Sequence, residues 1–292
     1  MTGPRSTKVP VDGGDLAVGV WGDEGPLVVA VHGITSHHRA WALVGDDLAA
    51  DHRFVAPDLR GRGHSRDLPA PYGMARHAAD LAEVIQAYGG TAVVVGHSMG
   101  AWVAVELARS YPMLVERLVL VDGGPAMPPP PGVPADPTPD QVTAAITETV
   151  GRAYQRLTMT FPDRAAYVAT WQAHPSFADW SRTMAEYAEY DLVEVDGALR
   201  PACHLEAALR DARDLFAWHP VAPAALPVPA VFLRAERGML DQPDPMIAAG
   251  AATRAFPGIA EREVPGTNHY TIVLGPKGAA EVAAEVRRGM AD

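Results

Sequence analysis

A run of valines leads directly into a serine flanked by glycines, and this junction constrains the fold more than any other segment. It reads Ala92-Val93-Val94-Val95-Gly96-His97-Ser98-Met99-Gly100-Ala101-Trp102. The pattern predicts a buried strand, a tight turn and a helix, the context that gives Gly-x-Ser-x-Gly its chemical meaning. Ser98 would then stand at a helix N-terminus, where the helix dipole favours developing negative charge. We interpret Ser98 as a candidate nucleophile; the alternative is a serine in an ordinary surface turn.

The flanking sequence alternates short apolar runs with amphipathic stretches. Continuous apolar strands separated by helices indicate a parallel sheet covered on both faces. The predicted strands are residues 16–21, 27–32, 54–57, 92–96, 118–121, 228–234 and 260–264, and the predicted helices are 77–88, 101–110 and 279–290.

This alternation is interrupted between about residues 123 and 222. Residues 125–139 are rich in proline and predict a linker, and residues 138–215 have helical spacing with no predicted strand. Long insertions in α/β domains are usually functional, and ligands bind at the carboxyl ends of the strands. We therefore predict a core domain of residues 1–122 and 223–292 and a helical cap of residues 123–222.

A serine hydroxyl needs a base within hydrogen-bonding reach. Among eleven histidines, His269 has the most suitable position, in a loop between the last predicted strand and the C-terminal helix. Residues that follow parallel strands share one edge of the sheet, so His269 and Ser98 are expected to meet there. The alternative is a structural loop histidine.

The base in turn needs a carboxylate to fix its tautomer. Asp122 follows the strand 118–121 directly, whereas Glu236 and Asp241 follow the strand 228–234. We favour Asp122 because it lies at the strand end itself, next to two glycines. Asp241 and Glu236 stay open as alternatives.

Two backbone amides are candidates for an oxyanion hole. Gly33 follows an early buried strand and lets the chain turn so that an amide faces the serine. The amide of Met99, the residue after the nucleophile, is the natural second donor. Each such donor contributes about 3 kcal/mol to transition-state stabilisation.

Together these segments resemble the α/β-hydrolase superfamily over nearly the whole chain. The resemblance rests on His32-Gly33-Ile34, Asp58-Leu59-Arg60-Gly61-Arg62-Gly63-His64-Ser65, Gly96-His97-Ser98-Met99-Gly100, the strand Leu118 to Asp122, and Gly266-Thr267-Asn268-His269. It implies an α/β fold with a mostly parallel eight-stranded sheet and a helical cap inserted after strand 6. It also implies Ser98 and His269 as nucleophile and base, and the Ile34 and Met99 amides as oxyanion donors.

One departure from the family pattern concerns the acid. Many relatives carry an aspartate in Gly-x-x-Asp after the seventh strand, where this chain has Gly238. Haloalkane dehalogenases and some fungal lactone hydrolases carry the acid after the sixth strand, which corresponds to Asp122. Dehalogenases and epoxide hydrolases themselves have aspartate at the position of Ser98, which disfavours those activities.

Composition limits the partners. The formal net charge is -11, which disfavours nucleic-acid binding, since phosphate contacts need clustered lysine and arginine. A single cysteine, Cys203, excludes an internal disulfide, and no signal core or membrane span is found, so we expect a cytoplasmic protein. Oligomeric state, including a homodimer, is left open. We expect no cofactor and no metal, because the five histidines at positions 32, 37, 38, 52 and 64 lack ligand spacing and paired carboxylates.

The predicted function is a serine hydrolase (a carboxylesterase or lactonase) that cleaves a small-molecule hydrophobic ester or lactone through an acyl-enzyme. Two alternatives remain: a carbon–carbon bond hydrolase acting on an acidic dienoate, which would need cationic residues near the site, and a non-enzymatic ligand receptor on a hydrolase scaffold. The expected pocket residues are Gly33, Trp102, Trp180, Met184, Tyr187 and Tyr190.

Overall fold

The computed structural model describes residues 3–126, 138, 140–141, 144–146, 148, 154–217 and 224–289. Its main feature is an eight-stranded sheet with the order β1-β2-β4-β3-β5-β6-β9-β10. Strand β2 is antiparallel to β1 and β4, and all other neighbours are parallel, which confirms the expected mostly parallel sheet. The strands are Arg5–Val11 (β1), Gly14–Trp21 (β2), Leu27–Val31 (β3), Arg53–Pro57 (β4), Ala92–His97 (β5), Val115–Val121 (β6), Ala230–Ala235 (β9) and Ala260–Val264 (β10).

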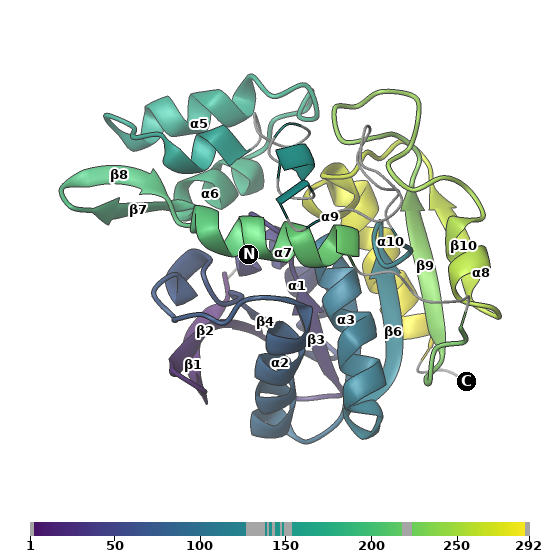
Figure 1. Cartoon of the computed structure of the whole chain (residues 1–292). Helices are drawn as coiled ribbons and strands as arrows, with labels where there is room; N and C mark the ends of the chain where they lie inside the picture. Colours follow the sequence, from purple (N-terminus) through teal and green to yellow (C-terminus); the bar gives the residue numbers. More distant parts are fainter. Residues whose placement is uncertain are drawn as a thin grey trace.

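Helices cover both faces of this sheet, as Figure 1 shows for α2 and α3 on one side and α10 on the other. Consecutive strand residues point to opposite faces, so Val29 packs with the α2 and α3 layer, while Val28 packs with the α1 and α10 layer. The helices are Ala42–Leu48 (α1), Met74–Tyr88 (α2), Met99–Ser110 (α3), Ala251–Ala255 (α8), Thr271–Leu274 (α9) and Pro276–Arg288 (α10), with short 3-10 turns at His38–Trp41 (η1), Gly63–Ser65 (η2) and Pro112–Leu114 (η3).

The described elements between β6 and β9 lie together on one side of the sheet, above the ends of its parallel strands (Figure 1). These elements are Arg156–Thr158 (η4), Arg164–Gln172 (α5), Arg182–Tyr190 (α6), Leu192–Val195 (β7), Ala198–Pro201 (β8) and Leu205–Ala217 (α7). We call this part the cap. Most of the proline-rich segment 125–139 and the predicted boundary at residue 223 lie outside the described residues.

The expectation that the cap contains no strand is wrong. Strands β7 and β8 form an antiparallel hairpin, in which Val195 pairs with Ala198. The turn residues Asp196 and Gly197 have φ angles of 52° and 76°, the left-handed conformation that two-residue hairpin turns require. Strands of four residues leave too short an alternation to stand out against the helical pattern around them.

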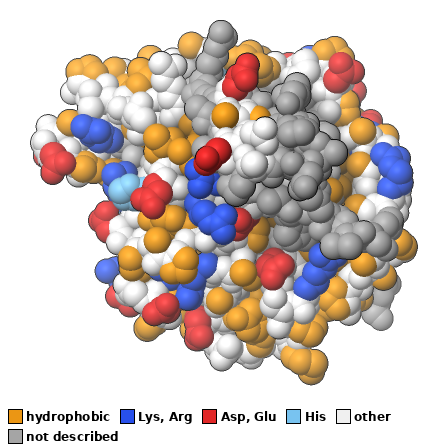
Figure 2. Space-filling model, viewed as in Figure 1, with side chains coloured by type: hydrophobic (Ala, Val, Ile, Leu, Met, Phe, Trp, Pro, Cys, Tyr) orange, Lys and Arg blue, Asp and Glu red, His pale blue; other side chains and the backbone are white. Residues whose placement is uncertain are grey.

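Strand β1 is not among the predicted strands; it lies at the sheet edge, and most of its side chains are exposed. Among the described residues on the face shown in Figure 2, acidic and basic side chains are interspersed. Within the described ranges, no helix combines the length and apolarity needed to cross a membrane.

Candidate active site

Ser98 occupies the strained turn that the sequence predicts between β5 and α3. Its φ and ψ angles are 52° and -129°, a conformation that costs a non-glycine residue about 1–3 kcal/mol and persists only where the surroundings enforce it. The turn is tight because a Cβ at Gly96 would lie 2.4 Å from the Gly100 carbonyl oxygen, and one at Gly100 would lie 2.1 Å from that of Val31. Ser98 is therefore held at the first turn of α3.

His269 and Asp122 complete a chain of hydrogen bonds that ends at Ser98. Nδ1 of His269 donates to Oδ2 of Asp122 over 2.6 Å, which leaves Nε2 to accept the Ser98 hydroxyl over 3.1 Å. Asp122 directly follows β6 with φ 46° and is fully buried. Its second oxygen accepts the Ala235 amide at the end of β9. The end of β9 thus orients the Asp122 carboxylate, which faces the histidine that follows β10.

The two other acid candidates lie close to this loop but have different partners. Oδ1 of Asp241 accepts from the Asn268 side chain over 3.0 Å and pairs with Arg237 at 2.9 Å. Glu236 accepts the Gly266 amide. In the described part of the chain, neither carboxylate contacts the ring of His269; both hold the loop that carries it.

Gly33 and Ile34 lie against the serine, where the oxyanion hole is expected. A Cβ at Gly33 would lie 3.1 Å from the Cβ of Ser98. The His32 ring braces this loop: its Nε2 accepts the Leu59 amide over 2.9 Å, and its Nδ1 donates to the Gly33 carbonyl over 2.8 Å. Burial lowers the pKa of His32 to about 3, which keeps the ring neutral and suited to both bonds.

His97 directly precedes Ser98, lines the cavity and bonds to the loop that carries the candidate base. Its Nε2 donates to the main-chain carbonyl of His269 over 2.8 Å, and the two rings lie 4.8 Å apart. His97 therefore fixes the backbone of the candidate base, whereas Asp122 binds its ring.

Ser98 and His269 open into a cavity of about 160 Å³ between the core and the cap. Its walls are mainly hydrocarbon and aromatic. The lining residues are Gly33, Ile34, Thr35, Ser36, Ala40, His97, Ser98, Trp102, Tyr154, Tyr187, Ala212, Leu215, Phe216, Met239, Met246, His269, Tyr270, Val273 and Leu274.

Three of the six expected pocket residues, Gly33, Trp102 and Tyr187, line this cavity. The structure places the other three elsewhere. Met184 and Trp180 pack into or against the aromatic interior of the cap. Tyr190 turns away to donate to Oδ2 of Asp58 over 2.7 Å. Along α6, Tyr187 therefore faces the cavity, Met184 packs in the apolar interior, and Tyr190 joins the cap to the core.

Leu215 and Phe216 are not among the predicted pocket residues, although both lie on the cavity side of α7. The amphipathic spacing of residues 205–217 could have shown which side chains share a face, but not that this face meets Ser98. Tyr270, next to His269, could have been found from its adjacency alone.

No lysine or arginine is among the described residues that line the cavity. Arg156, a half-buried cap arginine, pairs with Asp191 at 2.6 Å and lies 4.8 Å over the ring of Trp171. Arg62, which is fully buried, pairs with Asp211 at 2.5 Å. The charges of both arginines are therefore already paired.

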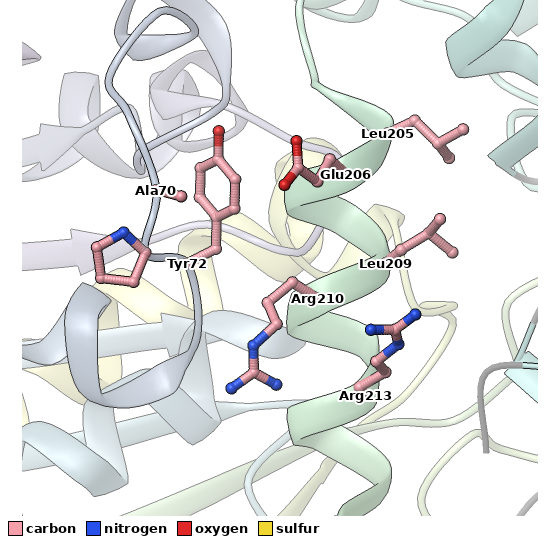
Figure 3. A pocket seen from close by; sticks show the side chains of 8 residues that line it. Ala70, Tyr72, Leu205, Glu206, Leu209, Arg210 and Arg213 are labelled. Atoms are coloured by element: carbon pink, nitrogen blue, oxygen red, sulfur yellow. The ribbon is translucent and has the colours of Figure 1, made fainter. Parts of the chain in front are cut away.

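A second hollow, of about 450 Å³, lies over the outer face of α7 (Figure 3). Tyr72 faces Glu206 and Arg210 across this groove, and Arg213 and Leu209 project from the same helix. None of its lining residues also lines the Ser98 cavity. Helix α7 thus has a cavity side and a groove side.

His37, His38 and His64 lie at the joint between α6 and the core, with their rings against Tyr187 or Tyr190. Asp58 is fully buried and accepts the His38 ring over 2.8 Å as well as the Tyr190 hydroxyl. The ring of His37 stacks on Tyr187 at 4.4 Å. Across the described residues, no three histidine, cysteine, aspartate or glutamate side chains form a group that could hold a metal ion.

Some known proteins are similar to only about a third of the chain. The chain is 37% identical over 101 residues to an uncharacterised protein of Mycobacterium tuberculosis, which covers 34% of this chain and 30% of that protein. It is 40% identical over 110 residues to Lipase LipV of the same organism, covering 37% of this chain and 41% of the lipase. The chain thus matches less than half the length of these relatives.

A longer match covers most of both chains. A 2-(acetamidomethylene)succinate hydrolase of Mesorhizobium japonicum is 30% identical over 257 residues, which is 87% of this chain and 84% of the relative. The crystal structure of an E-2-(acetamidomethylene)succinate hydrolase superposes with a TM-score of 0.75 at 26% identity, covering 97% of this chain and 98% of the other. The model of the alpha/beta hydrolase family matches residues 28–285. This chain therefore belongs to the alpha/beta hydrolase family.

Proposed function

We propose that this protein is a serine hydrolase that cleaves a small, uncharged, hydrophobic carboxylic ester or lactone through an acyl-enzyme. The observation that carries the proposal is the hydrogen-bond chain from Asp122 through His269 to Ser98, which ends in an apolar cavity. Such a chain suits a hydroxyl that must lose its proton while it attacks a carbonyl.

In the first half-reaction, Ser98 Oγ attacks the carbonyl carbon and passes its proton to Nε2 of His269. Asp122 stabilises the imidazolium that forms. The carbonyl oxygen becomes an oxyanion, for which the Ile34 and Met99 amides are the proposed donors. The intermediate collapses, the carbon–oxygen bond to the leaving group breaks, and the leaving alkoxide takes the proton from His269.

Water completes the second half-reaction. His269 accepts a proton from the water as its oxygen attacks the acyl carbon of the ester at Ser98. The second tetrahedral intermediate expels Ser98 Oγ, which takes the proton back, and the carboxylic acid leaves. With a lactone, alcohol and acid leave as one molecule because the ring keeps them joined.

The choice of an uncharged substrate rests on the lining of the cavity. An anionic group placed there would be desolvated with no cation among the described lining residues. The second candidate is a substrate with carboxylates, such as a dienoate or the succinate in the relative's name. It is favoured by the 30% identity over 87% of the chain.

A panel of substrates separates these candidates. We expect wild type to hydrolyse p-nitrophenyl acetate and butyrate and small aromatic lactones. We expect it to act weakly on 2-(acetamidomethylene)succinate and on dienoates, and we expect Ser98→Ala to lose at least ~1,000-fold in kcat. Faster turnover of the carboxylated substrates would overturn the substrate assignment. Tight binding of esters without turnover by wild type would instead point to a ligand receptor.

A further inference from the structure

Arg62 touches three parts of the molecule at once, although it contributes no atom to the cavity. Its side chain is fully buried. Nε donates to the Ile34 carbonyl over 2.9 Å, Nη1 donates to the Arg60 carbonyl over 2.9 Å, and Nη2 lies 2.5 Å from Oδ2 of Asp211 on α7. One guanidinium therefore joins the oxyanion loop, the segment around η2 and the cap.

The contact with Ile34 complements that made by His32. The Gly33 carbonyl, which His32 holds, belongs to the same peptide group as the Ile34 amide. The Ile34 carbonyl, which Arg62 holds, belongs to the next peptide group. The two peptide groups on either side of the Ile34 Cα are thus each fixed by a buried side chain, so the direction of the Ile34 N–H is set from both sides.

The contact of Arg62 with Asp211 links the oxyanion loop to the cap. Asp211 is fully buried on α7 and also binds Nε2 of His77 on α2 over 2.8 Å. Burial raises the pKa of its carboxyl, but the charge of Arg62 and the bond to His77 outweigh this and lower it to about 2. Asp211 is therefore a carboxylate. The cavity is lined by Ala212, which follows Asp211, and by Leu215, one turn further along α7. Arg62 therefore holds α7 next to the residues that form the cavity wall.

We propose that Arg62 is a positioning residue for the proposed hydrolysis, coupling α7 through Asp211 to the oxyanion loop through the Ile34 carbonyl. The inference rests on the proposed function. Lysine cannot replace Arg62 here, because only a planar guanidinium can reach two carbonyls and a carboxylate from one rigid group. Without the Arg62 guanidinium on the Ile34 carbonyl, the Ile34 amide loses its fixed direction. The transition state is then affected more than the bound substrate, since only the oxyanion needs the amide.

The test compares Arg62→Lys with Arg60→Lys. Arg60 is a matched control: it lies in the same segment, is 1% exposed and pairs with Asp80 through Nε at 2.9 Å, away from Ile34. We expect Arg62→Lys to lower both kcat for p-nitrophenyl butyrate and the rate of labelling by a fluorophosphonate about tenfold, with KM changed less than about twofold. We expect Arg60→Lys to keep both rates within about twofold of wild type.

A second variant removes the pair without leaving a buried charge. Arg62→Met with Asp211→Asn eliminates both charges and keeps an acceptor for His77, so it avoids the cost of one unpaired ion. We expect the same loss of kcat in a protein that still unfolds cooperatively, with a lower thermal midpoint because the Ile34 and Arg60 carbonyls lose their donor. Wild-type rates in either Arg62 variant, or an equal loss in Arg60→Lys, would overturn the inference alone. Failure of the fluorophosphonate to label wild type would overturn the proposed function and the inference with it.

Discussion

On the core side of the Ser98 cavity, polar groups are held by specific partners, whereas the cap side is built mainly from hydrocarbon and aromatic surface. Asp122, His269 and Ser98 form one chain of hydrogen bonds, and His97 and His32 brace the backbone beside it. The cap contributes side chains such as Phe216, from α7, and Tyr187, whose hydroxyl donates to Ser36 over 3.1 Å.

This difference separates two tasks. Transition-state stabilisation needs dipoles fixed in advance, so its groups belong on rigid strand ends. Discrimination between apolar substrates needs shape, and each methylene in a hydrophobic pocket contributes only about 1–3 kcal/mol. Changes in the core should therefore alter kcat strongly and selectivity little, and changes in the cap should do the reverse.

The largest predicted effect in the core, apart from loss of the nucleophile, follows Asp122→Asn. An amide at this position favours the wrong tautomer of His269 and cannot stabilise the imidazolium, so kcat should fall about 10⁴-fold. Steady-state kinetics on p-nitrophenyl butyrate measures it. The matched control is Asp241→Asn, which alters a contact to Asn268 next to the base and should cost less than about tenfold. The opposite ranking would move the acid to Asp241.

A smaller effect is predicted for the cap wall. Phe216→Ala enlarges the cavity from α7, so kcat/KM should shift by about tenfold from acetate and butyrate esters towards longer acyl chains. Rates over a series of p-nitrophenyl esters provide the measurement. Glu206→Ala, on the groove side of the same helix, should leave the preference unchanged. An equal shift in that control would show that helix stability, and not the shape of the wall, determines the preference.

The smallest predicted effect lies where core and cap meet. His37 is fully buried, and neither of its ring nitrogens has a hydrogen-bond partner among the described residues. Burial therefore lowers its pKa well below the 6.5 of an exposed histidine. As the pH falls below about 6.5, the unfolded chain takes up a proton that the folded protein excludes, so the free energy of unfolding decreases.

His37→Phe replaces the titratable imidazole with an uncharged ring that can still stack on Tyr187. Thermal unfolding followed between pH 7 and about pH 5 should show a shallower loss of stability in the variant than in wild type. His32 and His97 are buried in the same way, with lowered pKa values, and should maintain part of the slope. Parallel curves for variant and wild type would contradict the assignment of His37 as a buried neutral base.

The same contrast explains what could be predicted from sequence. The turn at Ser98 was predictable because a valine strand, two close-contact glycines and a helix are all encoded locally. Asp122 and His269 were predictable because both follow strand ends, which parallel topology brings to one edge. These core features depend on short-range patterns and a general rule of sheet geometry.

The cap wall depends on docking, which no local pattern encodes. The spacing on α6 groups Met184, Tyr187 and Tyr190 as candidates, yet only Tyr187 reaches the cavity. Arg62 stands out in the sequence only as a residue between two glycines. Its partners Ile34 and Asp211 lie 28 and 149 positions away, and only the folded chain brings them together.

The central claim is that Ser98 is the activated nucleophile of this cavity. The most direct measurement is treatment of wild type and Ser98→Ala with a fluorophosphonate, followed by peptide mapping by mass spectrometry. The account predicts one phosphonyl adduct on the peptide that contains Ser98, and no adduct in the variant. An unlabelled wild type, or equal labelling of Ser98→Ala at another residue, would contradict it.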